Sequence, residues 1–180
     1  MLKFMTALVC AGFFWAQGAE LTWNQSAAGS IIFHAYAKPM PAPEFSLEDL
    51  QGKMVDIRQL RGQVTLLNFW ATWCPNCRKE SSSFEKLSSQ YSGKGLILFR
   101  INSKESRESV EEYLRKESLH VPVLLDKTGK VGRLFGIWAH PTSYLIDRQG
   151  MVRYRAVGPV EWTGPEALSV IDQLLKEKNR

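Results

Sequence analysis

Two cysteines, Cys74 and Cys77, lie between an apolar run and a segment that can form a helix, and this arrangement constrains the fold most. Residues 64–70 read VTLLNFW, which has the length and the nearly continuous apolar character of a strand buried on both faces. Pro75 suits the first position of a helix, where no backbone N–H is needed, so residues 75–91 are expected to form one. The sequence therefore predicts a buried strand that leads directly into a helix with Cys74 at its N-terminus.

The spacing of the two cysteines favours redox chemistry. Side chains three positions apart on a helix have Cβ atoms about 5–6 Å apart, so a small adjustment brings two sulfurs into bonding range. The free amides and the dipole at a helix N-terminus favour the thiolate of Cys74 and lower its pKa from about 8.5 into the range of roughly 3.5–7.5. We expect Cys74 to attack the substrate and Cys77, which should be more buried, to resolve the mixed disulfide.

Two other uses of a cysteine pair fit this sequence less well. An inert disulfide between residues three apart closes too small a loop to constrain the unfolded chain much. A structural zinc site usually has four ligands, and His34, His120 and His140 follow no ligand spacing. The sequence thus predicts a redox-active disulfide, no bound metal and no other cofactor.

The first 18 residues have the features of a secretory signal peptide. Lys3 supplies a positive charge, residues 4–16 are apolar, and small residues at positions 16 and 18 match a signal peptidase site. The apolar run is shorter than the roughly 20 residues that span a bilayer, which favours a cleaved signal over an anchor. Cys10 follows the bulky Val9, where a lipid-attachment signal has a small residue. We therefore expect export to the periplasm without lipidation.

Length and charge indicate a single domain that does not bind nucleic acid. A chain of 180 residues has room for one domain and short extras. The 23 Lys and Arg residues are scattered among 18 Asp and Glu residues, without the basic stripe or binding motif of nucleic-acid proteins. We expect a signal peptide over residues 1–18, an N-terminal extension over residues 19–42 and the folded domain over residues 43–180.

The remaining segments alternate between strand and helix patterns. Strands are predicted at residues 55–60, 95–101 and 121–125, a hairpin at residues 142–147 and 151–157, and an additional edge strand at residues 31–36. Helices are predicted after an N-cap at Ser106, over a short turn at residues 130–135, and after a capping box at residues 163–166. Together these segments predict an α/β fold in which helices flank a mixed sheet.

A second motif, His140-Pro141-Thr142, stands at the start of a predicted strand, a natural place for a cis proline. With residues 42–47, 60–62, 67–74 and 121–126, it makes the sequence resemble the exported TlpA/ResA-like disulfide reductases of the thioredoxin superfamily. The resemblance covers about residues 43–175. It implies a thioredoxin fold with an N-terminal hairpin and an inserted helix–strand unit at about residues 103–126. It also implies that Pro141 is cis and packs against the dithiol, beside backbone that pairs with an extended substrate.

The resemblance further implies a periplasmic thiol–disulfide oxidoreductase. Members of the family pass electrons from a membrane thiol carrier to disulfides of exported proteins, often those of apocytochrome c awaiting haem. The predicted site combines the catalytic residues Cys74, Cys77 and Glu80 with the substrate-binding residues Trp73, Pro75, Asn76, His140 and Pro141.

Three polar residues near the motifs bear on the chemistry. Glu80 matches an acidic residue of the family and is predicted either to exchange a proton with Cys77 or to be a solvated helix residue. Asn68 stands where thioredoxin has a buried aspartate, so a proton relay needs another group. His140 replaces a more usual aliphatic residue and would, when protonated, stabilise a Cys74 thiolate; alternatively it faces solvent over the groove.

Two alternatives to a reductase stay open at this level. One is an oxidase that forms disulfides, which differs in reduction potential rather than in motif. The other is a binding module that holds copper(I) through Cys74, Cys77 and His140, because soft thiolates suit that ion. For a reductase we predict that the reduction potential of the Cys74–Cys77 pair is more negative than about −200 mV.

Overall fold

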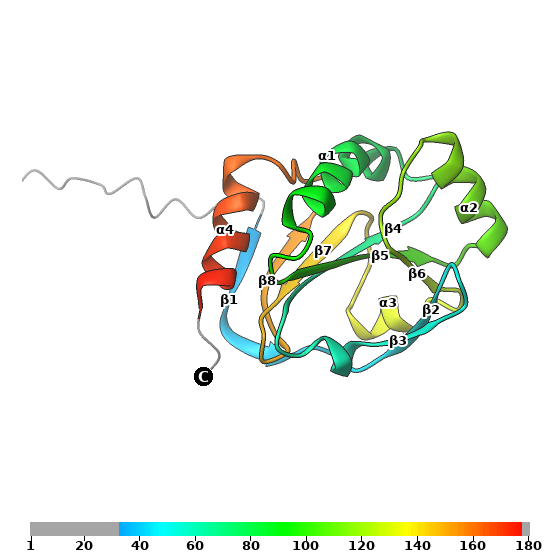
Figure 1. Cartoon of the computed structure of the whole chain (residues 1–180). Helices are drawn as coiled ribbons and strands as arrows, with labels where there is room; N and C mark the ends of the chain where they lie inside the picture. Colours follow the sequence, from blue (N-terminus) through cyan, green and yellow to red (C-terminus); the bar gives the residue numbers. More distant parts are fainter. Residues whose placement is uncertain (1–32, 178–180) are drawn as a thin grey trace, which may run out of the picture.

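The computed structural model describes residues 33–177, which form one mixed eight-stranded sheet with helices on both faces (Figure 1). The strands are β1 (Phe33–Pro41), β2 (Ser46–Asp49), β3 (Met54–Asp56), β4 (Val64–Trp70), β5 (Leu96–Ser103), β6 (Val123–Asp126), β7 (Thr142–Ile146) and β8 (Met151–Val157). The helices are α1 (Pro75–Tyr91), α2 (Arg107–Lys116), α3 (Lys130–Leu134) and α4 (Pro165–Lys176), with a 3-10 turn at Ile57–Leu60. The predicted signal peptide lies outside the described residues.

The strand order is β1-β8-β7-β4-β5-β6-β2-β3. Strands β4, β5 and β6 are parallel, and the other neighbours are antiparallel. This arrangement places β4 at the centre, where all seven of its residues are buried. The α/β class with a thioredoxin fold is confirmed, including the β2–β3 hairpin and the α2–β6 insertion.

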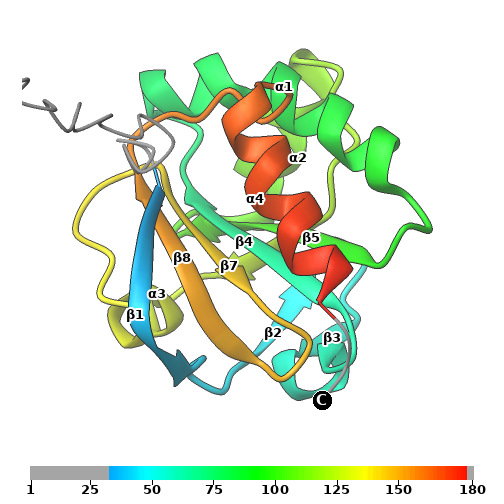
Figure 2. The same ribbon diagram turned by 90° about the vertical axis from the view of Figure 1, so that its left-hand side faces the viewer.

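Each face of the sheet has its own core, because side chains alternate along β4. Leu66 and Trp70 pack with residues of α1, α2 and α4 on one face, including Phe84 and Ile171. Leu67 and Phe69 pack with α3 and the 3-10 turn on the other face. Figure 2 shows α1 and α4 lying across the sheet on the side opposite α3. The described residues include no helix long and apolar enough to cross a bilayer.

Several predicted boundaries differ from the structure. Residues 55–60 were expected to form one strand, but β3 ends at Asp56, whose side chain accepts a hydrogen bond from the Arg58 amide and caps the 3-10 turn. The capping box at residues 163–166 is wrong: the N-cap of α4 is Gly164, without a side-chain cap. The Thr163 hydroxyl instead donates to Glu161. The N-cap at Ser106 is confirmed by its hydrogen bond from the Ser109 amide, 3.2 Å.

Strand β1 is longer than the edge strand predicted at residues 31–36, of which the first two lie outside the described part of the chain. It runs through Pro39 to Pro41, in the segment predicted as an N-terminal extension. Prolines are tolerated there because an edge strand leaves one row of backbone groups unpaired, and the register with β8 shifts between Ala35 and Met40.

Candidate active site

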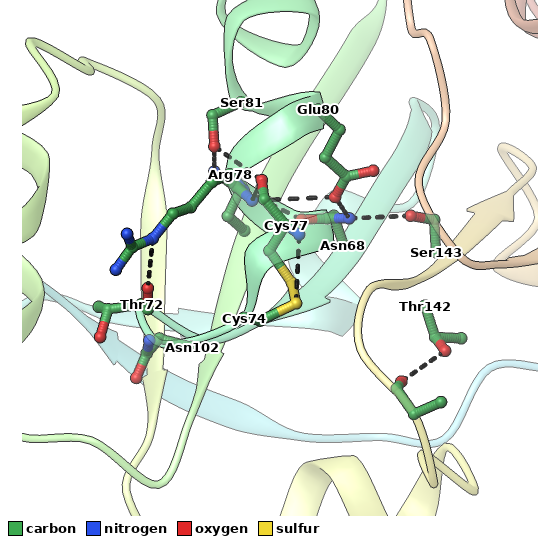
Figure 3. The surroundings of a disulfide bond; sticks show 12 residues. Asn68, Thr72, Cys74, Cys77, Arg78, Glu80, Ser81, Asn102, Thr142 and Ser143 are labelled. Atoms are coloured by element: carbon green, nitrogen blue, oxygen red, sulfur yellow. Dashed lines mark hydrogen bonds and ion pairs between the residues drawn. A yellow bond between two sulfur atoms is a disulfide. The ribbon is translucent and has the colours of Figure 1, made fainter.

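The cysteine pair lies where the central strand meets the first helix, as the sequence predicts. Cys74 is the N-cap of α1 and Pro75 is its first residue. The two cysteines form a disulfide with Cα atoms 5.3 Å apart, and the Cys74 sulfur accepts a hydrogen bond from the Cys77 amide, 3.1 Å (Figure 3). Cys74 retains 3% exposure and Cys77 has none. An incoming disulfide therefore reaches Cys74 first, and the helix amide is placed to stabilise its thiolate.

The predicted substrate-binding residues form the rim around this disulfide. Trp73, 65% exposed, and Pro75 and Asn76 surround Cys74 on the surface. The peptide bond between His140 and Pro141 is cis, in agreement with the resemblance. The rings of Trp73 and His140 pack edge to face with centroids 6.0 Å apart, so the two sequence motifs meet at this rim.

Glu80 is not a solvated helix residue. Its side chain is fully buried one turn beyond Cys77, on the sheet-facing side of α1. One carboxylate oxygen accepts from the Asn68 amide at 2.7 Å, and the other accepts from the Val160 backbone at 3.2 Å. The Asn68 amide also donates to Ser143 at 3.0 Å, which ties Glu80 to two strands of the sheet (Figure 3).

The partner of Glu80 is Arg100, a fully buried arginine in β5. Its guanidinium lies 3.8 Å from the Glu80 carboxylate and 4.3 Å from the centre of the Trp70 ring. It donates to Asn68 at 3.0 Å, to Ser81 at 2.9 Å and to the Cys77 carbonyl at 3.3 Å. The network thus joins the backbone of the buried cysteine to the buried carboxyl group.

Burial raises the pKa of Glu80 to about 7, although the charge of Arg100 and the hydrogen bonds from Val160 and Asn68 lower it. Burial likewise lowers the pKa of Arg100 to about 10, against the opposing charge of Glu80. Near neutral pH, Arg100 is therefore cationic while Glu80 is divided between its two protonation states. A buried carboxyl group in that condition can accept and release a proton.

His140 is half-buried, and burial lowers its pKa, against a backbone hydrogen bond with Phe69 and the charge of Glu105. The lowered pKa favours the neutral imidazole at neutral pH. Any electrostatic support of a Cys74 thiolate by a protonated ring is correspondingly reduced.

Sequence reasoning missed Arg100 and Glu105. Arg100 interrupts the apolar run LILFRIN, and a charged residue inside a strand expected to be buried was the available signal. Glu105 accepts hydrogen bonds from the Thr72 backbone at 2.8 Å and from Asn102 at 2.6 Å, which links the loop before Trp73 to the end of β5. No local pattern marks that contact, because it joins segments 33 positions apart.

Within residues 33–177, no three His, Cys, Asp or Glu side chains are grouped to hold a metal ion. The copper alternative with Cys74, Cys77 and His140 stays a prediction, since the two cysteines are joined in a disulfide in this structure.

Comparison with known proteins shows which proteins the chain resembles. Residues 40–155 match the model of the AhpC/TSA family. The chain is 35% identical over 111 residues to the thiol-disulfide oxidoreductase ResA of Bacillus thuringiensis, covering 62% of this chain and 64% of that relative, slightly under two thirds of its length. It is 31% identical to the thioredoxin-like protein YneN of Bacillus subtilis, over 80% of this chain and 89% of YneN.

Among solved structures, a putative thiol:disulfide interchange protein DsbE from Chlorobium tepidum matches with a TM-score of 0.71. The identity is 30%, over 77% of this chain and 97% of that one. These matches confirm the resemblance to ResA-like proteins.

Proposed function

Because the chain belongs to the AhpC/TSA family, we propose that it is a thiol–disulfide oxidoreductase that reduces disulfides of exported proteins through Cys74 and Cys77. The observation that carries the proposal is the position of Cys74. It caps α1, accepts a hydrogen bond from the Cys77 amide and lies at the surface end of a disulfide whose other sulfur is buried. The relatives named as thiol-disulfide oxidoreductases support the same function for this chain.

In the proposed cycle, the reduced protein begins with Cys74 as a thiolate. Its sulfur attacks one sulfur of the substrate disulfide, forming a mixed disulfide and releasing the other substrate sulfur as a thiolate that takes up a proton. Cys77 then loses its proton and attacks the Cys74 sulfur, which releases the second substrate thiol and closes the Cys74–Cys77 disulfide. The substrate gains two electrons from the dithiol and two protons; one proton balances the one that Cys77 loses, and the other comes from solvent because Cys74 begins as a thiolate.

Glu80 is the proposed acceptor for the Cys77 proton. It lies one turn beyond Cys77, has no exposed surface and has a pKa of about 7, so a fraction of it is ionised at neutral pH. Arg100 holds the Cys77 carbonyl and faces the Glu80 carboxylate, which makes it a positioning residue. The rim of Trp73, Pro75 and Asn76, with His140 and Pro141, is the proposed surface for the substrate backbone.

The cellular part of the proposal rests on the sequence and the resemblance. Residues 1–18 would direct export to the periplasm. There a membrane thiol carrier would return the protein to its dithiol form, and disulfides of exported proteins, including apocytochrome c, would be its substrates.

The test combines a trapping experiment with a measurement of the reduction potential of the Cys74–Cys77 pair. Cys77→Ser should accumulate a mixed disulfide through Cys74, whereas Cys74→Ser, its matched control, should accumulate little. Equilibration of the wild-type protein with graded dithiothreitol should give a potential more negative than about −200 mV. Trapping through Cys77 would refute the assigned roles, and a potential near about −120 mV would indicate an oxidase that forms disulfides.

A further inference from the structure

A groove of about 330 Å³ borders the rim of the redox disulfide, although neither cysteine lines it. Trp73 and His140, which precede Cys74 and Pro141 in sequence, form one end of its wall. Lys104, Gly129, Arg133 and Ile137 are among the residues that continue the wall toward α3. A polypeptide whose cysteine reaches Cys74 therefore passes next to this groove.

The backbone fixes Lys104 on the groove wall. Lys104 has a left-handed backbone conformation, with φ of 62°, immediately after β5. Its amide donates to the Asp126 carbonyl at 3.1 Å, and the Gly129 amide donates to the same carbonyl at 3.0 Å. The Lys104 side chain then crosses Gly129 so closely that a Cβ atom at that position would collide with Lys104 Cε. The absence of a side chain at Gly129 thus makes room for Lys104.

The groove wall carries two cations and no acid. Among residues 33–177, the Lys104 ammonium group makes no hydrogen bond or ion pair. Arg133 is exposed and donates only to the Thr128 carbonyl, 3.2 Å, among the described residues. Both cations are therefore available to a ligand.

The acids closest to these loops are already occupied. Glu105 accepts from Thr72 and Asn102, and Asp126 accepts from the Gly132 amide at 2.8 Å. Neither residue lines the groove. Both Glu105 oxygens and one Asp126 oxygen accept from donors of the protein itself, and the other Asp126 oxygen is buried without a hydrogen-bond partner among the described residues. The free charge that a ligand meets in the groove is positive.

We infer that this groove binds an aspartate or glutamate side chain of the substrate polypeptide, next to the cysteine that Cys74 attacks. The inference rests on the proposed function and names the class of substrate that it prefers. Lys104 and Arg133 pair with the carboxylate, while Trp73 and Ile137 contact the aliphatic part of the same side chain. Substrates with an acidic residue beside the reactive disulfide are then reduced faster than neutral ones.

The test uses two synthetic peptides, each closed by one disulfide and identical except for Glu or Gln on both sides of one cysteine. Single-turnover rates with the reduced wild-type protein should favour the Glu peptide about three- to fivefold at low salt, the range of a partly exposed ion pair. The Glu-to-Gln rate ratio with the protein is divided by the same ratio measured with dithiothreitol alone. This division removes the effect of Glu on the intrinsic reactivity of the peptide disulfide. Lys104→Gln should lower the normalised ratio toward one, while Arg133 retains part of the preference.

Lys94→Gln is the matched control, because Lys94 lies beyond the far end of α1, over Tyr91, and loses the same charge. It should keep the wild-type ratio. An equal loss in both variants would show that net charge, not the groove, selects the peptide and would refute the inference. A normalised ratio of one for the wild-type protein would also refute the inference. Failure to reduce even the Gln peptide would instead refute the proposed function.

Discussion

Replacement of Glu80 by glutamine should remove a specific part of the pH dependence of stability. Burial raises the pKa of Glu80 in the folded protein to about 7 from an ordinary value of 4.5. The folded state therefore holds this proton more tightly than the unfolded state does. As pH rises from 4.5 to 7, the unfolded chain loses the proton first, and the folded state becomes less stable relative to it.

The size of the effect follows from the shift. A difference of about 2.5 pKa units corresponds to about 3 kcal/mol at roughly 1.4 kcal/mol per unit. The free energy of unfolding of the wild type, relative to Glu80→Gln, should fall by about 3 kcal/mol between about pH 4 and about pH 8. Arg100 does not contribute within this window, because its pKa stays near 10.

Urea denaturation of the oxidised proteins at a series of pH values measures this difference. Urea is preferred to guanidinium chloride, whose ions would screen the charges. Glu111→Gln is the matched control: Glu111 is exposed on α2, and its replacement should shift the curve by less than about 0.5 kcal/mol at every pH. Parallel curves for the wild type and Glu80→Gln would show that Glu80 ionises normally and would refute its assignment as the proton acceptor.

Two further predictions concern the neighbours of the dithiol. Arg100→Met leaves the Glu80 carboxyl group buried without its cation, so it should cost about 3–5 kcal/mol of unfolding free energy at about pH 8 and less at about pH 4.5. Urea denaturation measures both losses, and equal losses at the two pH values would contradict the role of the charge pair. His140→Leu should leave the ultraviolet thiolate absorbance of Cys74 unchanged at about pH 7.5, because burial lowers the pKa of His140 from its ordinary value of 6.5 and keeps the ring neutral there. A loss of absorbance should appear only at pH values well below 6.5, where the ring becomes charged. If the thiolate absorbance of His140→Leu is lower than that of the wild type by the same amount up to about pH 8, the His140 ring stays charged and the prediction is wrong.

Local sequence determined the framework of the active site. A continuous apolar run, a cysteine, and a proline suited to the first helical turn were enough to predict β4 and α1, and α1 spans residues 75–91 as expected. The position of Cys74 at the helix N-terminus follows from the same few residues. These features depend on interactions within one or two helical turns, which neighbouring residues specify.

The protonation chemistry behind the dithiol was decided by tertiary structure. Spacing alone favoured a solvated position for Glu80, and only the family resemblance made a role beside Cys77 an equal alternative. Its burial depends on Val160, 80 positions away, and on Arg100 in β5. Burial and the proximity of charges set the pKa of a carboxyl group, and both are sums over segments distant in sequence. The cysteine pair could therefore be assigned from the sequence, whereas the state of Glu80 and the part played by Arg100 required the packed fold.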